Sequence, residues 1–158
     1  MSKFENTKNN KQIFRIIFGI GSNLGNKALN LDLASEKLEN YLELKEIKKS
    51  NIFQNPAMLL EGSPQEWDID FFNIALSANI NLEKFPPEEI LKIIKNIEQE
   101  LGRKNNQKWS PRPIDIDILA IENLEIKIEN LLQIPHQDFL KRDFFVKTVK
   151  EIEPTYIK

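Results

Sequence analysis

Apolar and acidic residues alternate strictly over residues 114–118, which read Ile-Asp-Ile-Asp-Ile. Such alternation is typical of a β-strand with one buried face. The isoleucines are expected to face the core, and Asp115 and Asp117 then share the opposite face, about 6–7 Å apart. Two carboxylates this close repel each other, so one of them tends to hold a proton. A divalent cation removes that conflict, and magnesium prefers hard oxygen ligands of this kind.

Basic residues gather just before this strand: Arg103, Lys104, Lys108 and Arg112, with Trp109 among them. A metal held by carboxylates can bridge phosphate oxygens while guanidinium groups bind the others in bidentate fashion. The alternative is a solvent-exposed strand face after a basic loop, and for the acidic pair alone that is the better interpretation. Because the pair occurs together with four cations and a tryptophan, we favour a polyphosphate site.

Composition limits the classes of protein and of site. The chain has 158 residues, a formal net charge of −2, one histidine and no cysteine. The charge gives no basic field for nucleic acid, and the lack of cysteine excludes disulfides and argues against a zinc site. No apolar run has membrane-spanning length, and no signal peptide is recognised. We therefore predict a cytoplasmic protein with a flexible tail (residues 1–11) and a single domain (residues 12–158).

Hydrophobic periodicity predicts the order strand, helix, strand, strand, helix, strand. The predicted strands are 12–20, 46–54, 70–80 and a last one from 114, and the predicted helices are 27–42 and 87–101. Residues 119–128 extend the last strand or form a short hairpin. Asn26 is the expected N-cap of the first helix, Gly102 ends the second, and a short final helix follows that Asp143 is able to cap. This order matches the split β-α-β pattern, so we predict an α+β, ferredoxin-like fold: a three-layer α/β/α sandwich with a mainly antiparallel sheet.

A glycine-rich segment, residues 19–25, joins the first strand to the first helix. Its spacing differs from those of dinucleotide and phosphate loops, since its last two glycines are four apart and no Gly-Lys-Ser/Thr follows. A tight turn in which glycines permit unusual backbone angles is the better local interpretation. The second half of this turn could still line a site at the end of the strand.

Phe71 and Asn73 are neighbours on one face of the predicted strand 70–80. Such a pair can stack on a flat heterocycle and hydrogen-bond its edge, although a packed phenylalanine and a solvated asparagine are more common. His136 is the lone histidine, and a lone histidine more often has a structural than a catalytic role. Neither feature alone decides a function.

Taken together, seven blocks resemble the 6-hydroxymethyl-7,8-dihydropterin pyrophosphokinase family. They are residues 19–25, 53–56, 70–75, 97–103, 109–119, 134–136 and 142–144. The most specific is the W-x-P-R-x-x-D-x-D pattern that begins at Trp109. The resemblance implies a ferredoxin-like fold and transfer of the β,γ-diphosphoryl group of ATP to the pterin hydroxymethyl oxygen, with release of AMP.

The resemblance also implies roles for single residues. The expected catalytic residues are Arg103, Arg112, Asp115 and Asp117, and the two aspartates are expected to bind two magnesium ions. The expected ATP contacts are Glu98, Arg103, Trp109, Arg112, His136 and Arg142. The expected pterin contacts are Asn55, Met58, Phe71, Asn73, Trp109 and Phe144, with the ring between the two phenylalanines. Segments 57–69 and 104–110 are expected to close over the substrates, and the chain to act as a monomer without nucleic-acid or membrane partners.

The chain departs from the family pattern at several places, among them a shorter segment between Arg103 and Trp109 and the turn at residues 53–56. Asn105 stands where some members carry a second arginine, and Phe71 stands where tyrosine is common, which keeps the stacking ring and removes a hydroxyl. Two other functions stay open. An RNA- or nucleotide-binding module lacks support, because neither an RNP-type aromatic pattern nor a basic sheet face is found. A magnesium-dependent phosphohydrolase would consume ATP without pterin.

Overall fold

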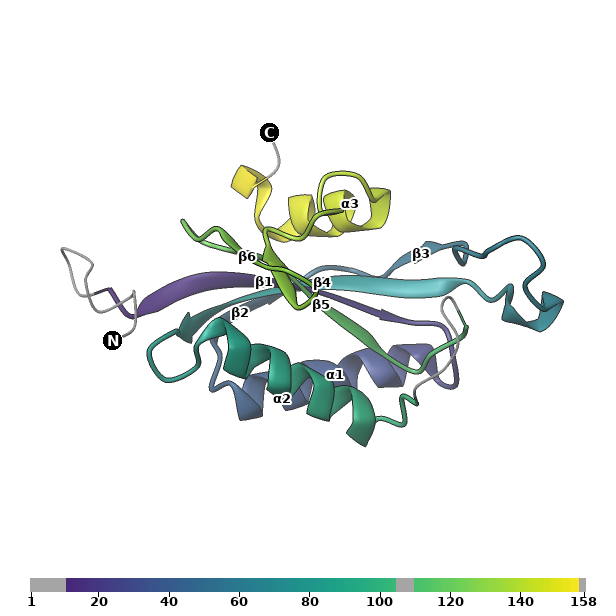
Figure 1. Ribbon diagram of the computed structural model, residues 1–158, viewed down its shortest axis with the longest axis horizontal. Coiled ribbons are helices and arrows are strands. Elements are labelled where there is room, and N and C mark those ends of the chain that lie inside the picture. The colour runs from purple at the N-terminus through teal and green to yellow at the C-terminus, as the bar shows by residue number, and fades with distance from the viewer. Residues whose placement is uncertain (1–10, 105–109, 157–158) are drawn as a thin grey trace.

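The computed structural model describes residues 11–104 and 110–156, in which a five-stranded sheet carries helices on both faces (Figure 1). Helices α1 (Lys27–Tyr41) and α2 (Pro87–Glu100) lie against one face, and α3 (Asp143–Ile152) covers the other. The predicted three-layer arrangement is therefore confirmed. None of the described helices is both long enough and apolar enough to cross a membrane.

The order of the strands in the sheet differs from their order along the chain. The strands are β1 (Ile13–Ser22), β2 (Lys45–Lys49), β3 (Phe53–Asn55), β4 (Phe71–Asn81) and β5 (Asp115–Ile121), while β6 (Ile126–Ile128) and β7 (Leu132–Ile134) form a separate hairpin. The order in the sheet is β2-β4-β1-β5, with β3 also on β4, and these pairings are antiparallel. This is the ferredoxin-like order that the sequence predicts.

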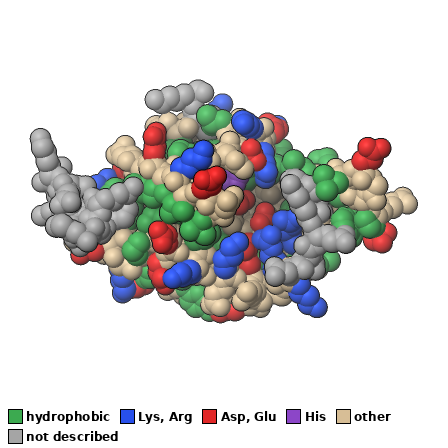
Figure 2. All heavy atoms as spheres, in the orientation of Figure 1, with side chains coloured by type: hydrophobic (Ala, Val, Ile, Leu, Met, Phe, Trp, Pro, Cys, Tyr) green, Lys and Arg blue, Asp and Glu red, His purple; other side chains and the backbone are tan. Residues whose placement is uncertain are grey.

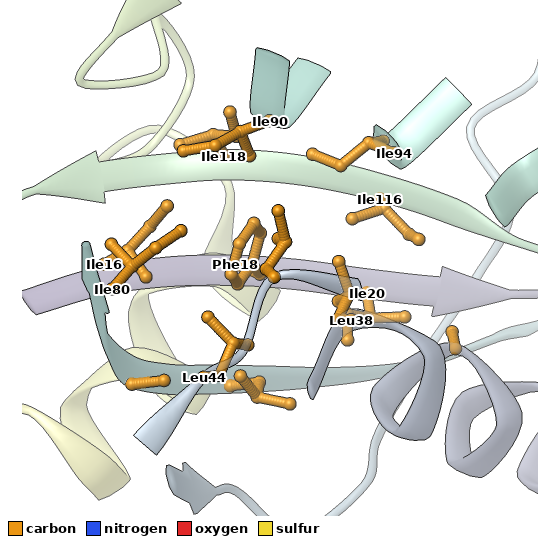
Figure 3. Close-up of a cluster of buried hydrophobic side chains, with 14 of the residues drawn as sticks. Ile16, Phe18, Ile20, Leu38, Leu44, Ile80, Ile90, Ile94, Ile116 and Ile118 are labelled. Atoms are coloured by element: carbon orange, nitrogen blue, oxygen red, sulfur yellow. The ribbon is translucent and has the colours of Figure 1, made fainter. Parts of the chain in front are cut away.

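The main core lies between the sheet and helices α1 and α2. Alternate residues of the central strands point into it, among them Ile16, Phe18 and Ile20 of β1 and Ile116 and Ile118 of β5 (Figure 3). Burial of each such side chain contributes about 1.5–3 kcal/mol. The alternation therefore fixes which face of β5 carries its two carboxylates, namely the face toward α3.

A smaller cluster fills part of the α3 face. Ile17, Ala75 and Leu119 of the sheet pack there against Phe145 and Val149 of the helix. Ser22, Phe71 and Asp115, at one end of β1, β4 and β5, are not part of this cluster. That end of the sheet is where the predicted site residues gather.

An ion pair ties the end of α3 to the sheet. Arg15 Nε donates to Glu153 Oε2 at 2.8 Å, and Ser77 Oγ donates to the same oxygen at 2.6 Å. Burial acts to raise the pKa of Glu153, but the hydrogen bonds from Ser77 and Arg15 outweigh it and lower that pKa below its ordinary value of 4.5. Folding thus favours the charged carboxylate here.

Three local predictions need correction or completion. The predicted strand 46–54 is two strands, because Ser50 interrupts the ladder: its hydroxyl accepts the Ala75 N–H at 2.9 Å. Asp143 is the first residue of α3 and pairs with Lys147, so it does not cap the helix. Both alternatives predicted for the residues after Leu119 occur: β5 extends to Ile121, and the β6–β7 hairpin follows.

The start of α1 is as predicted, because Asn26 Oδ1 accepts the Leu29 N–H at 3.1 Å. Its last helical residue is Tyr41 rather than residue 42. The predicted tail lies almost wholly in residues 1–10, outside the described part of the chain. The single-domain boundary therefore stays a prediction.

Candidate active site

The carboxylate pair of β5 faces two glycines on the neighbouring strand. Asp115 pairs with Gly21 and Asp117 with Gly19 across the β1–β5 ladder, and on the other side Gly21 pairs with Asn73 of β4. Glycine has no side chain above the sheet. The β1 backbone at these glycines therefore forms part of the floor of a hollow that the two aspartates, Asn73 and Phe145 also line.

Close packing explains why both positions are glycine. A Cβ at Gly21 would lie 2.7 Å from Asn73 Oδ1, and one at Gly19 would lie 2.9 Å from Phe145 Cε1. Both residues belong to β1, and within segment 19–25 only Gly25 has a left-handed backbone, with φ +74°. The tight-turn interpretation is therefore wrong for Gly19 and Gly21, and it is the first half of the segment that lines a site.

The first pocket lies over this hollow. Its lining includes the five described residues predicted to contact pterin: Asn55, Met58, Phe71, Asn73 and Phe144. Arg112, Asp115, Asp117 and Arg142 complete its polar side. The Asn73 amide is buried and donates to Asn55 Oδ1. The pocket thus offers aromatic walls, a fixed carboxamide and a charged end.

A second, larger pocket of about 610 Å³ lies between α2, β5 and the β6–β7 hairpin. Ile94, Ile118 and Leu132 give it an apolar wall, and Glu98, Arg103, His136 and the two aspartates are among its polar lining. Figure 2 shows acidic and basic side chains gathered around a hollow beside the histidine. Asp115 and Asp117 line both pockets, so the two hollows meet at the carboxylate pair.

Arg103 is held between two acidic residues. Its Nη1 donates to Glu98 Oε2 at 2.6 Å and to Asp115 Oδ1 at 2.9 Å. Glu98 is buried and also accepts the Ile116 N–H at 2.9 Å. Glu98, which the resemblance places among the ATP contacts, is thus a buried hydrogen-bond acceptor beside Arg103.

Burial and like charge shift the pKa values of the acids. Burial, reinforced by the neighbouring Asp115 charge, raises the pKa of Asp117 to about 8. Burial also raises the pKa of Glu98, although Arg103 and the Ile116 N–H oppose it. The conflict between two close carboxylates, expected from the alternation, is thus present in the folded chain.

His136 faces Asp117 rather than the apolar core. Its Nδ1 accepts the Asp138 N–H at 3.0 Å, so a neutral ring carries its proton on Nε2, which lies 3.7 Å from Asp117 Oδ1. Burial, followed by the charge of Arg142, lowers the pKa of this histidine. The ring therefore presents an N–H toward the carboxylate pair.

Arg142 is fixed by the same acidic residue that orients the histidine. Its Nη2 donates to Asp138 Oδ2 at 2.8 Å, and its guanidinium lies 5.5 Å from the centre of the Phe145 ring. Sequence reasoning missed Asp138, Phe145 and the pocket-lining glycines. A usable signal for Asp138 was its position two residues after His136 and four before Arg142.

The structure therefore brings most of the predicted site residues to one end of the sheet. Arg112 joins them, with Nη1 4.0 Å from Asp115 Oδ1. Trp109, like Lys108 and Asn105, lies outside the described residues.

Comparison with known proteins identifies the family. The family profile of 7,8-dihydro-6-hydroxymethylpterin-pyrophosphokinase matches residues 17–154. The chain belongs to that family. The 2-amino-4-hydroxy-6-hydroxymethyldihydropteridine pyrophosphokinase of Aquifex aeolicus is 40% identical over 142 residues, which are 90% of this chain and 82% of that protein.

Several other relatives are longer than this chain. A folate synthesis bifunctional protein of Chlamydia muridarum is 38% identical over 88% of this chain but only 30% of its own length. A crystal structure of Plasmodium falciparum HPPK-DHPS with pterin and p-hydroxybenzoate superposes with a TM-score of 0.64 at 15% identity, covering 97% of this chain and 42% of that one. This last likeness concerns the fold.

Family membership confirms the predicted resemblance and the predicted activity. The chain is a diphosphokinase of folate biosynthesis with ATP as co-substrate.

Proposed function

We propose that the two pockets hold the two substrates of this pyrophosphokinase, and that the reaction takes place where they meet. The observation that carries the proposal is that Asp115 and Asp117 line both pockets. The pterin hydroxymethyl oxygen forms a bond to Pβ of ATP, and the bond from Pβ to the oxygen on Pα breaks. The hydroxyl proton passes to solvent and AMP leaves. Such a transfer depends on positioning and on charge stabilisation.

The pterin binds in the first pocket, with its ring between Phe71 and Phe144 and its edge at Asn73. Aromatic stacking suits a flat heterocycle, and a buried carboxamide offers both a donor and an acceptor. Asn55 holds the Asn73 amide, and Met58 contributes to the wall of the same pocket. The hydroxymethyl group then points toward the carboxylate pair at the charged end.

ATP binds in the second pocket, with its base near the apolar wall and its phosphates at the basic side chains. Arg103 and Arg112 approach Asp115 from the sequence segment before β5 and contact the triphosphate. His136 offers its Nε2–H and Arg142 its guanidinium to phosphate oxygens. Glu98 lines this pocket, and because its carboxylate is engaged by Arg103 and Ile116, its contribution is to hold the arginine.

Asp115 and Asp117 suit magnesium, for which two ions per site are proposed. Their hard oxygens fit this ion, and the like-charge conflict between them is relieved by a cation. Within residues 11–104 and 110–156 no group of three or more potential metal-ligating side chains is found. Phosphate oxygens and water would supply the other magnesium ligands, as is usual for this ion. Magnesium, when bound, neutralises phosphate charge and holds reacting oxygens in line. The monomeric state and the cytoplasmic location stay predictions.

The test is an assay with ATP, magnesium and 6-hydroxymethyl-7,8-dihydropterin, in which AMP and ADP are separated by chromatography. The proposal requires AMP in amounts equal to the pterin consumed, and none when pterin is left out. Formation of ADP, or of phosphate without pterin, would favour a hydrolase. Tight nucleotide binding without turnover would favour a binding module.

A further inference from the structure

Asn23 connects three segments that are far apart in the sequence. It follows the last residue of β1 and is 1% exposed. Its Oδ1 accepts the Arg112 N–H at 2.8 Å, its own N–H donates to Arg112 O at 3.1 Å, and its Nδ2 donates to Ile69 O at 3.1 Å. One side chain thus joins the end of β1, the segment before β5 and the segment before β4.

The two bonds to Arg112 fix its backbone on both sides. The peptide N–H and the carbonyl of this residue are both bound to Asn23, which closes a small ring of hydrogen bonds. The side chain that starts from this backbone donates from Nε to Ser110 O at 3.3 Å and ends 4.0 Å from Asp115 Oδ1. The place of the guanidinium therefore depends on the amide of Asn23.

The hydrogen bond to Ile69 O acts on the first pocket through the segment before β4. Ile69 stands two residues before Phe71, which lines that pocket. The next carbonyl, that of Asp70, accepts a hydrogen bond from Lys27 Nζ at 3.0 Å. Two consecutive carbonyls are thus held just before the strand that carries Phe71 and Asn73.

We infer that Asn23 is a positioning residue for diphosphoryl transfer, which sets Arg112 against Asp115 and couples that setting to the approach to the pterin pocket. The inference rests on the proposed function. A carboxamide serves both contacts, because it combines an acceptor with N–H donors. Aspartate keeps the acceptor for Arg112 and loses the donor for Ile69, while alanine loses both side-chain contacts.

The two contacts give two different kinetic readouts. We expect Asn23→Asp to keep kcat within about threefold and to raise the KM for pterin, because the bond to the Arg112 N–H is retained. We expect Asn23→Ala to lower kcat by about tenfold to a hundredfold as well, since small displacements of a positioned group have effects of that size. A role in folding alone would produce no such division between kcat and KM.

A double-mutant cycle decides whether Asn23 acts through Arg112. In an Arg112→Ala background, adding Asn23→Ala should lower kcat by less than about twofold, because the group that it positions is already absent. An equal loss in both backgrounds would overturn the inference, as would an unchanged kcat in Asn23→Ala. If circular dichroism shows that Asn23→Ala does not fold, Asn23→Asp decides: a kcat as low as that of Arg112→Ala overturns the inference, and a retained kcat with a raised pterin KM supports it.

Asn26 provides a matched control three residues away. Its amide caps α1 through the Leu29 N–H and lines neither pocket. Asn26→Ala should lower Tm through loss of the cap while kcat and both KM values stay within about twofold. The wild-type assay separates the two ideas, because absence of pterin-dependent AMP there refutes the proposed function, whereas the cycle refutes only the role of Asn23.

Discussion

A single methyl group at Gly21 should close the pterin pocket while leaving the nucleotide pocket open. In Gly21→Ala the added Cβ would lie 2.7 Å from Asn73 Oδ1 and 3.4 Å from Phe71 Cδ1. Because non-bonded atoms of this kind are most stable at about 3.5–4.0 Å, the amide must move by roughly an ångström. The Asn73 side chain has little room to do so, since it is buried and bound to Asn55.

The size of the effect follows from the hydrogen bonds that the displaced amide loses. Each is worth about 0.5–1.5 kcal/mol, and two of them together correspond to a rise of about 5- to 150-fold in the KM for pterin, at 1.4 kcal/mol per factor of ten. The KM for ATP should change by less than about twofold, because Gly21 and Asn73 do not line the second pocket. Steady-state AMP formation measured against each substrate in turn supplies both constants.

The double variant Gly21→Ala/Asn73→Ala is the control for this reasoning. Removal of the Asn73 side chain removes the clash, so the double variant should bind pterin no worse than Asn73→Ala alone. An unchanged pterin KM in Gly21→Ala would refute the account of the pocket. A further loss in the double variant would show that the methyl group acts through some other contact.

Two other perturbations test the acidic residues. Glu98→Gln keeps an acceptor for the Ile116 N–H but removes the charge that holds Arg103. The KM for ATP should therefore rise several-fold, and urea denaturation should show a loss of about 1–2 kcal/mol in the free energy of unfolding. An unchanged KM for ATP would contradict the role of Glu98 in holding Arg103. Glu153→Gln should lower the free energy of unfolding at pH 7 by about 1–2 kcal/mol. Because folding lowers the pKa of Glu153, the stability that its carboxylate contributes is fully present above about pH 4.5. That stability is lost as the pH falls through the lower pKa of the folded state. The difference between wild type and Glu153→Gln in urea denaturation should therefore shrink at acid pH, and a constant difference would contradict the charge-based explanation.

Much of the fold and the site followed from the two-residue period of the strands. Alternation at 114–118 placed Asp115 and Asp117 on one face, and alternation at 70–80 placed Phe71 beside Asn73, as the structure has them. Such patterns are local, and they act through the same burial that forms the core. The positions of these residues could therefore be predicted from the sequence.

Features that depend on contacts between strands could not be predicted from the sequence. The interpretation of Gly19 and Gly21 as a turn considered only neighbours in the chain, whereas Asn73 and Phe145, which require glycine there, come from β4 and α3. The register that sets Gly21 between Asp115 and Asn73 cannot be read from any one strand. Asn23 was passed over for the same reason, because its partners lie 46 and 89 residues away.

The central claim is that the carboxylate pair serves the chemistry between two binding pockets. Its most direct test is the variant Asp115→Asn/Asp117→Asn, in which both side chains keep their size and lose their charge. AMP formation with magnesium should fall at least about a thousandfold, since charge stabilisation dominates this kind of transfer. Pterin binding, followed by calorimetry, should stay within a few-fold of wild type, because stacking and the Asn73 amide remain. Turnover above about a tenth of the wild-type rate would contradict the claim.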